Sequence, residues 1–201
     1  MLAEWSAECA PDDPVLVVPW SNPSLDPDSP GSHFVDLREN PYDLDHLPEA
    51  EHFPALMHAL RALNAARSPV FTAKCDAWSL EPEEVQQLHF DIDIDPTHEP
   101  LPAGFTSYID LLLRDRARFL SVHHHQQFLD RLVRRAAPLD HPHAMLDCVI
   151  RPALLDLTGP QEGFAISLYI KALGLDPNAA RNNWSAALED VILLLRAKDI
   201  T

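Results

Sequence analysis

Hydrophobic and polar residues alternate along several segments of the chain. The alternation is strictest over residues 88–95, where Leu, Phe and Ile occupy every second position and His or Asp stands between them. A period of two predicts a half-buried strand with one apolar and one polar face. The segments 70–78, 145–157 and 164–171 carry strand-like runs of apolar, β-branched and aromatic residues. We therefore predict four strands, with a loop over residues 80–87 between the first two.

Apolar residues at helical spacing predict the helices. One stripe runs over residues 54–66, where Pro54 suits the first helical position. A second region, 107–137, contains neither Pro nor Gly, and Ser107 can cap a helix there. Its apolar stripe changes phase near its middle, so we expect two helices or a bend. Asp176 followed by Pro predicts the start of a last helix.

These elements follow one another as helix, strand, strand and helix, and the order then repeats. Such an order favours an α+β fold, in which a mainly antiparallel sheet has helices packed on one face. We expect residues 48–201 to form a single domain, with a possible pseudo-repeat of 48–121 and 122–201. Prolines concentrate before residue 55. Residues 1–47 are therefore predicted to form an irregular Pro-rich arm that packs on the domain and holds one or two short strands.

The charge balance limits the partners that the chain can bind. Its 201 residues include 15 Lys+Arg and 31 Asp+Glu, which gives a formal net charge of −16. This charge repels nucleic-acid phosphates and anionic lipid surfaces, so we expect neither partner. No apolar run is long enough to cross a membrane, and the N-terminus does not resemble a secretory signal. Three widely spaced cysteines are typical of reduced thiols, and we expect a cytoplasmic protein.

Several motifs that carry chemistry are missing from the sequence. None of the five glycines precedes a lysine, and no two have the spacing of a dinucleotide-binding turn. The sequence also lacks the Gly-x-Ser-x-Gly pattern of a nucleophile elbow. With no complete catalytic or cofactor motif, we expect no cofactor, and the hypothesis of a binding protein is favoured over that of an enzyme.

The predicted strands place polar residues on one face of the sheet. Residues of both charges together with aromatic rings are typical of a surface that binds a ligand or a partner. Ser167 and Lys171 could join this face. Polar residues in this arrangement would equally suit a face that only contacts solvent. The candidate binding residues are Lys74, Asp76, Trp78, His89, Asp91, Asp93 and Tyr169.

The alternating segment also offers a candidate metal site. On a strand, His89, Asp91 and Asp93 would share one face, and carboxylates suit a hard divalent cation. The leading hypothesis is nevertheless an accessory subunit that acts through protein–protein contact. The alternatives are a metal-dependent enzyme that uses this cluster, and a homo-oligomer in which the sheet face is the interface.

Overall fold

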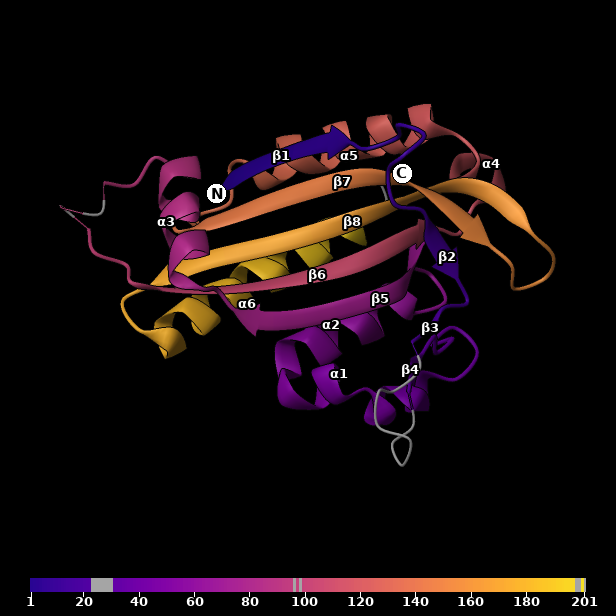
Figure 1. Ribbon diagram of the computed structural model, residues 1–201, viewed down its shortest axis with the longest axis horizontal. Helices are drawn as coiled ribbons and strands as arrows, with labels where there is room; N and C mark the ends of the chain where they lie inside the picture. The colour runs from indigo at the N-terminus through magenta and orange to yellow at the C-terminus, as the bar shows by residue number, and fades with distance from the viewer. Residues whose placement is uncertain (23–30, 96, 98, 198–199, 201) are drawn as a thin grey trace.

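A six-stranded mixed sheet forms the centre of the protein in the computed structural model, which describes residues 1–22, 31–95, 97, 99–197 and 200 (Figure 1). The strands are β1 (Leu2–Ala7), β2 (Leu16–Val18), β5 (Val70–Ser79), β6 (Ala103–Leu113), β7 (Ala144–Leu155) and β8 (Gln161–Gly174). They lie in the order β1-β7-β8-β6-β5, and β2 also pairs with β7. The pairs among β5, β6, β7 and β8 are antiparallel, whereas β1 and β2 run parallel to β7. The predicted α+β fold class is confirmed, with a mixed sheet.

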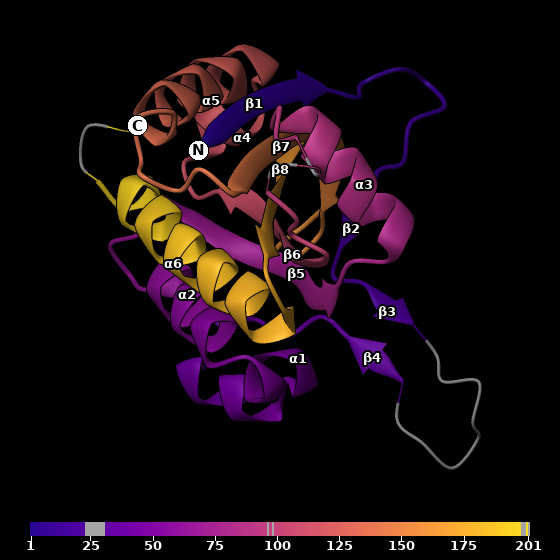
Figure 2. The same ribbon diagram turned by 90° about the vertical axis from the view of Figure 1, so that its left-hand side faces the viewer.

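Three helices cover one face of this sheet (Figure 2). They are α2 (Pro54–Asn64), α5 (Val122–Ala136) and α6 (Pro177–Leu195). The indole of Trp184 on α6 is 1% exposed and packs edge-on against the ring of Phe105 at a centroid distance of 4.8 Å. The short helices η1 (Pro41–His46) and α1 (Pro48–His52) precede α2, and α4 (Arg116–Phe119) precedes α5. The large core of the protein lies between this helical layer and the sheet.

The prediction of a strand over residues 88–95 is wrong, because this segment belongs to helix α3 (Pro82–Asp91) and the turn after it. A capping box between Glu81 and Glu84, with Pro82 at the first helical position, starts the helix where the sequence had suggested a loop. Leu88 is buried, whereas Phe90 is 82% exposed, so residues two apart do not share a face.

The second incorrect prediction is the helix expected to begin at Ser107. Residues 103–113 form β6, in the middle of the sheet between β5 and β8. The leucines and Ile109 that fit a helical stripe are buried on both faces of this central strand. A strand covered on both sides carries apolar residues at nearly every position, which removes the period that would identify it. The later part of the region is helical, as predicted, in α4 and α5.

The first residues of the chain belong to the sheet. Strand β1 lies beside β7, and β2 continues along the same edge. Strands β3 (Ser21–Asn22) and β4 (Ser32–His33) form a second, two-stranded sheet, and residues 23–30 of the predicted arm lie outside the described residues. Val18 is fully buried against β5, β6 and β7, and the indole Nε1 of Trp20 donates a hydrogen bond to the carbonyl of Ala73. None of the described helices combines the length and apolarity needed to cross a membrane.

The sheet face opposite the helical layer is covered only at its two ends (Figures 1 and 2). At one end, α3 packs through Val85 and Leu88 onto Met145 and Leu173. Gly104 allows this approach, since a Cβ there would lie 2.8 Å from the Leu80 side chain. At the other end, apolar residues of β2 and the following segment pack onto the sheet. One helix therefore lies on the face that the sequence analysis had left without helices.

Candidate functional site

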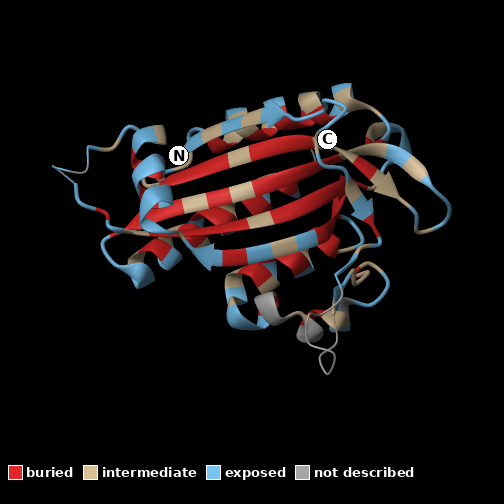
Figure 3. Cartoon of the chain, in the orientation of Figure 1, coloured by how far each residue is buried: buried red, intermediate tan, exposed pale blue. Residues whose placement is uncertain are grey.

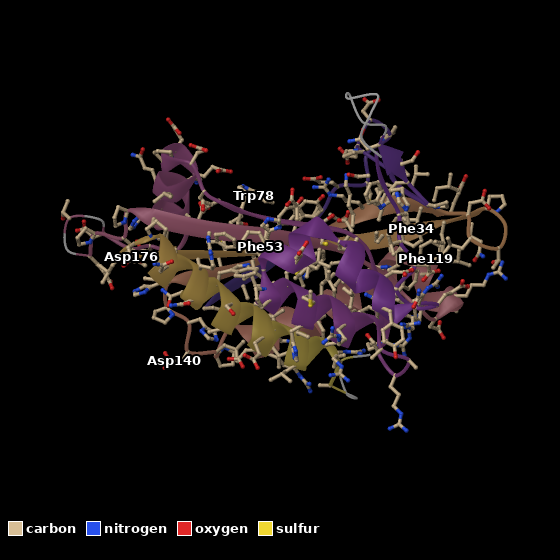
Figure 4. The ribbon with its side chains drawn as sticks, turned by 90° about the horizontal axis from the view of Figure 1, so that it is seen from below. Phe34, Phe53, Trp78, Phe119, Asp140 and Asp176 are labelled. Atoms are coloured by element: carbon tan, nitrogen blue, oxygen red, sulfur yellow. The ribbon has the colours of Figure 1, made fainter. Side chains whose placement is uncertain are left out.

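The uncovered middle of this face carries a group of polar and aromatic side chains that we call the polar sheet face. Four adjacent strands contribute to it, and Figure 4 shows Trp78 there, above the strands and between α3 and the N-terminal segment. Its members are Lys74, Asp76 and Trp78 on β5; Thr106, Tyr108 and Asp110 on β6; Ser167, Tyr169 and Lys171 on β8; and Asp147 and Arg151 on β7.

The sequences of β6 and β8 change from apolar to polar and back on this one face. On β8, Leu173 lies under α3, three polar residues follow at every second position, and Ala165 then packs under the N-terminal segment. On β6 the same face carries Gly104 at one end and Leu112 at the other. The polar positions coincide across strands because the antiparallel register aligns them. Figure 3 shows the central strands almost entirely buried, whereas β5 retains exposed positions.

The register places aromatic rings and carboxylates in one row across the sheet. Asp76 pairs with Tyr108, Tyr108 pairs with Tyr169, and Tyr169 pairs with Asp147. The rings of Tyr108 and Tyr169 are 6.1 Å apart between centroids, and that of Trp78 lies 6.2 Å from Tyr108. Three rings therefore lie in contact across β5, β6 and β8, with a carboxylate at each end of the row.

A hollow of about 290 Å³ opens between these strands and α3. Trp78 and Tyr169 supply its aromatic part, while Glu84 comes from α3 and Glu8 from the segment after β1. Pockets for small molecules typically enclose about 300–1,000 Å³, so this hollow is at the lower limit of that range. It also includes Leu80, Thr106, Asp147, Val149, Arg151 and Lys171.

Asp110 and Ser167 form a buried polar pair on the face. Asp110 is 7% exposed and Ser167 is 4% exposed, and the Ser167 hydroxyl donates a hydrogen bond of 2.6 Å to the Asp110 carboxylate. Burial raises the pKa of Asp110, and the hydrogen bond from Ser167 and the positive charges of Arg151 and Lys74 partly offset that rise. The Asp110 carboxylate is therefore removed from water, and the neutral Ser167 hydroxyl donates a hydrogen bond to it.

Three neighbouring groups have their pKa values shifted in the same direction. Burial raises the pKa of Tyr108, and the negative charges of Asp110 and Asp76 raise it further. Burial also raises the pKa of Tyr169 and that of Asp147. Groups with shifted pKa values occur often at functional sites, although structural networks shift them too. In each group, loss of hydration makes the negatively charged form less favourable.

Arg151 connects the far side of the face to β1 and the segment after it. One of its guanidinium nitrogens lies 3.2 Å from the Glu8 carboxylate and donates a long hydrogen bond of 3.5 Å to the Tyr169 hydroxyl. Two buried polar atoms nearby have no hydrogen-bond partner among the described residues: the Arg151 Nε and the Thr106 Oγ1. An unsatisfied buried polar atom costs about 1–3 kcal/mol, so each is a position where a bound group can contribute a hydrogen bond.

Lys74 connects the opposite side of the face to the N-terminal segment. Its ammonium lies 5.3 Å from the centre of the Trp20 ring. The Trp20 indole in turn bonds to the Ala73 carbonyl, next to the irregularity in the pairing of β5 with β6. The ammonium of Lys74 therefore lies beside the N-terminal segment, and its charge also acts on Asp110.

The structure brings together four of the seven binding residues expected from the sequence. Lys74, Asp76 and Trp78 share the face with Tyr169, across β5, β6 and β8. The period of two in β5 and β8 accounts for this shared face, because it assigns side chains to faces without knowledge of the neighbouring strands.

The other three expected residues do not extend that face as strand neighbours. His89 lies on α3 and is buried, with Nε2 3.0 Å from the Leu101 carbonyl oxygen. Asp91 accepts a hydrogen bond from Gln87, and its charge contributes to the raised pKa of Asp147. Asp93 is exposed in a turn with a positive φ of 58°. The common face expected for a metal site does not form, because the residues lie on a helix and a turn. No three His, Cys, Asp or Glu residues within the described part of the chain are arranged to hold a metal ion.

Sequence reasoning missed Thr106, Tyr108, Asp110, Asp147 and Arg151. The first three belong to the strand that had been predicted as a helix. Their spacing of two residues, with β-branched and aromatic residues between and beside them, is the signal that identifies this strand. The two residues on β7 lie in a predicted strand, but only the register with β8 shows that they join the face.

A larger hollow of about 950 Å³ lies on the outer side of α3. Its walls include Phe90, Ile94 and Leu101 and are mainly apolar. Part of its boundary is the segment between Asp95 and Pro100, in which residues 96 and 98 lie outside the described residues. We therefore base the functional argument on the polar sheet face, whose members are all described.

Comparison with protein-family models, curated proteins and solved structures finds no match to this chain.

Proposed function

We propose that the protein is a cytoplasmic binding or accessory subunit that acts through protein–protein contact at the polar sheet face. The observation that carries the proposal is the change of residue type along β6 and β8, apolar at both covered ends and polar or aromatic between them. Tyrosine, tryptophan and arginine are enriched at the centres of protein interfaces, and all three residue types occur here.

The net charge of −16 supports a partner with a basic surface rather than a nucleic acid. The odd number of cysteines supports a reducing compartment. A metal-dependent enzyme has less support, because its three candidate ligands do not share a face. The alternative partner is a second copy of the chain, and the following experiment distinguishes it from another protein.

The test compares recovery of partners by two variants of the full chain. Asp76→Ala with Trp78→Ala alters exposed residues of the polar sheet face. Glu189→Ala with Leu193→Ala is the matched control, since it removes one acid and one exposed apolar side chain from α6 on the opposite side. Both variants should keep the wild-type melting temperature, because exposed side chains contribute little to folding.

We expect the wild type and the α6 control to recover the same protein from a lysate of the source organism, and the β5 variant to lose it. The recovered protein, once purified, should bind the wild type with an affinity that the β5 changes weaken by about tenfold or more, as at interface centres. If the only partner is a second copy, sedimentation will show a dimer that the β5 changes dissociate. Equal recovery by all three proteins would overturn the proposal.

A further inference from the structure

The chemistry around Tyr108 favours one class of ligand. Its ring lies between the rings of Trp78 and Tyr169, opposite Asp76 on β5, and two residues before Asp110 on its own strand. The faces of aromatic rings carry partial negative charge and attract cations. Aromatic and anionic groups thus surround this position.

Each cation of the polar sheet face has an anionic or aromatic neighbour. Arg151 forms an ion pair with Glu8, and the charge of Lys171 acts on Asp147. The ammonium of Lys74 lies over Trp20 in the N-terminal segment. Opposite Tyr108 in the register stand Asp76 and Tyr169, an anionic and an aromatic group. The positive charges of Arg151 and Lys74 act on Asp110, two residues further along β6.

A second, independent observation comes from Thr106. Its side chain is 1% exposed, lines the hollow beside Trp78, and has an Oγ1 with no hydrogen-bond partner among the described residues. A hydroxyl can accept a hydrogen bond from an ammonium or guanidinium N–H. Such a donor would form the hydrogen bond that the buried Thr106 Oγ1 lacks among the described residues.

The size of the hollow further restricts the ligand. At about 290 Å³ it is at the lower limit for a small-molecule pocket, and its lining holds three carboxylates against the two cations Arg151 and Lys171. A guanidinium is planar, stacks on aromatic rings and donates several hydrogen bonds in fixed directions, whereas an ammonium is compact and strongly hydrated. Rings that meet edge-on or tilted, beside a carboxylate and a hydroxyl, match the first of these better.

We propose that the polar sheet face receives an arginine side chain from a basic segment of a protein partner, with the guanidinium over Tyr108 and beside Asp76. This inference rests on the proposed function and adds the chemistry of the partner to it. The alkyl part of the arginine packs against Trp78, and an N–H group bonds to the Thr106 hydroxyl. The negative charge of the whole protein attracts the basic segment during association.

The experiment titrates the full-length protein with a capped Gly-Arg-Gly peptide and follows the indole resonance of Trp78 by NMR. The same peptide with citrulline, a neutral analogue of similar shape, shows whether the charge is required. We expect the arginine peptide to shift the Trp78 signal saturably, lysine to act more weakly, and citrulline to have little effect. Equal shifts by arginine and citrulline would overturn the proposal.

Matched variants separate this site from the general acidity of the protein. Asp76→Asn and Glu51→Gln each remove one negative charge, and Glu51 lies on α1. We expect Asp76→Asn to weaken binding about tenfold, as for the loss of one charge-assisted hydrogen bond, and Glu51→Gln to have little effect. Tyr108→Phe keeps the ring and should bind like the wild type, whereas Tyr108→Leu should not. Equal losses in both charge variants would contradict a specific site.

Two further probes test other occupants. Mg²⁺ or Ca²⁺ that shifts the same resonances would assign the face to a metal ion, and a Gly-Glu-Gly peptide that does so would assign it to an anion held by Lys171 and Arg151. Either result overturns the arginine proposal. If no peptide binds while the β5 variant still loses its purified protein partner, the proposed function stands and the ligand class is wrong. If the β5 variant still binds both the protein partner and the peptide, the proposed function and the arginine proposal are both wrong.

Discussion

Leu88 and Phe90 test whether α3 is a helix as packed in the structure. On a strand these two residues would point to the same face, whereas on α3 Leu88 is 1% exposed and Phe90 is 82% exposed. Leu88 contacts a small apolar cluster with Val85, Leu101 and Leu173. We therefore expect Leu88→Ala and Phe90→Ala to have very different effects on the free energy of unfolding.

The size of each effect follows from burial. Leu→Ala changes at fully buried positions cost about 2–5 kcal/mol, and the cost is smaller where the neighbours can move into the cavity. The Leu88 cluster is small and lies at one end of the sheet, so we expect a loss of about 2–3 kcal/mol. Phe90→Ala removes a ring that solvent already surrounds, and alanine favours the helix, so the change should stay within about 0.5 kcal/mol.

Urea unfolding followed by circular dichroism measures both variants against the wild type. The dependence of the free energy on urea should be the same for all three proteins, so that the midpoints report stability directly. A loss for Phe90→Ala as large as that for Leu88→Ala would show that both residues face the core. That result would contradict the assignment of α3 as a helix and would favour a strand over residues 88–95.

Two further changes test the interior of the polar sheet face and its connection to the N-terminal segment. Ser167→Ala removes the hydrogen bond that lowers the raised pKa of Asp110, so this pKa should rise further. Because the charged carboxylate then lacks its donor, we expect the free energy of unfolding to fall by about 1–3 kcal/mol at pH 7. The loss should be smaller near pH 3, where the carboxyl is protonated in both folded and unfolded chains. Equal losses in urea unfolding at both pH values would contradict this. Trp20→Phe keeps a ring but removes the hydrogen bond to Ala73, and should lower the unfolding free energy by about 1 kcal/mol. Unchanged stability of the Trp20 variant would show that the bond contributes nothing.

The sequence predicted those elements whose boundaries carry local signals. Pro54 and Asp176 mark the starts of α2 and α6, and both helices have a clear apolar stripe. Strand β5 is an edge of the main sheet, and the exposed positions from Lys74 onward preserve its alternation over its second half. In such segments the local pattern and the tertiary environment agree.

The failures have two different physical causes. Residues 88–95 alternate by coincidence, and the helix start at Glu81 and Pro82 outweighs that pattern, together with the packing of Leu88 on the sheet. Strand β6 is covered on both faces over much of its length, so its leucines also fit a helical stripe. Only the neighbouring strands decide between the two interpretations.

For the same reason, only part of the polar sheet face could be predicted from the sequence. Lys74, Asp76 and Trp78 follow from the period of one strand, without knowledge of the rest of the fold. Tyr108, by contrast, joins the face only when β6 pairs with both β5 and β8. Register between strands distant in sequence is a tertiary property, and the pattern within one strand does not contain it.

The buried polar groups of the open face argue against a role as plain solvated surface. A sheet face that only contacts water can keep its polar side chains hydrated at no cost. Here Thr106 and Asp110 are 1% and 7% exposed, because neighbouring side chains cover them. Removing such groups from water costs free energy unless hydrogen bonds replace the lost hydration, and Thr106 has no such bond among the described residues.

A sequence that specified stability alone would place apolar residues at both positions, as it does at Gly104 and Leu112 on the same strand face. Polar residues at a cost in stability are expected where a bound partner supplies the missing hydrogen bonds.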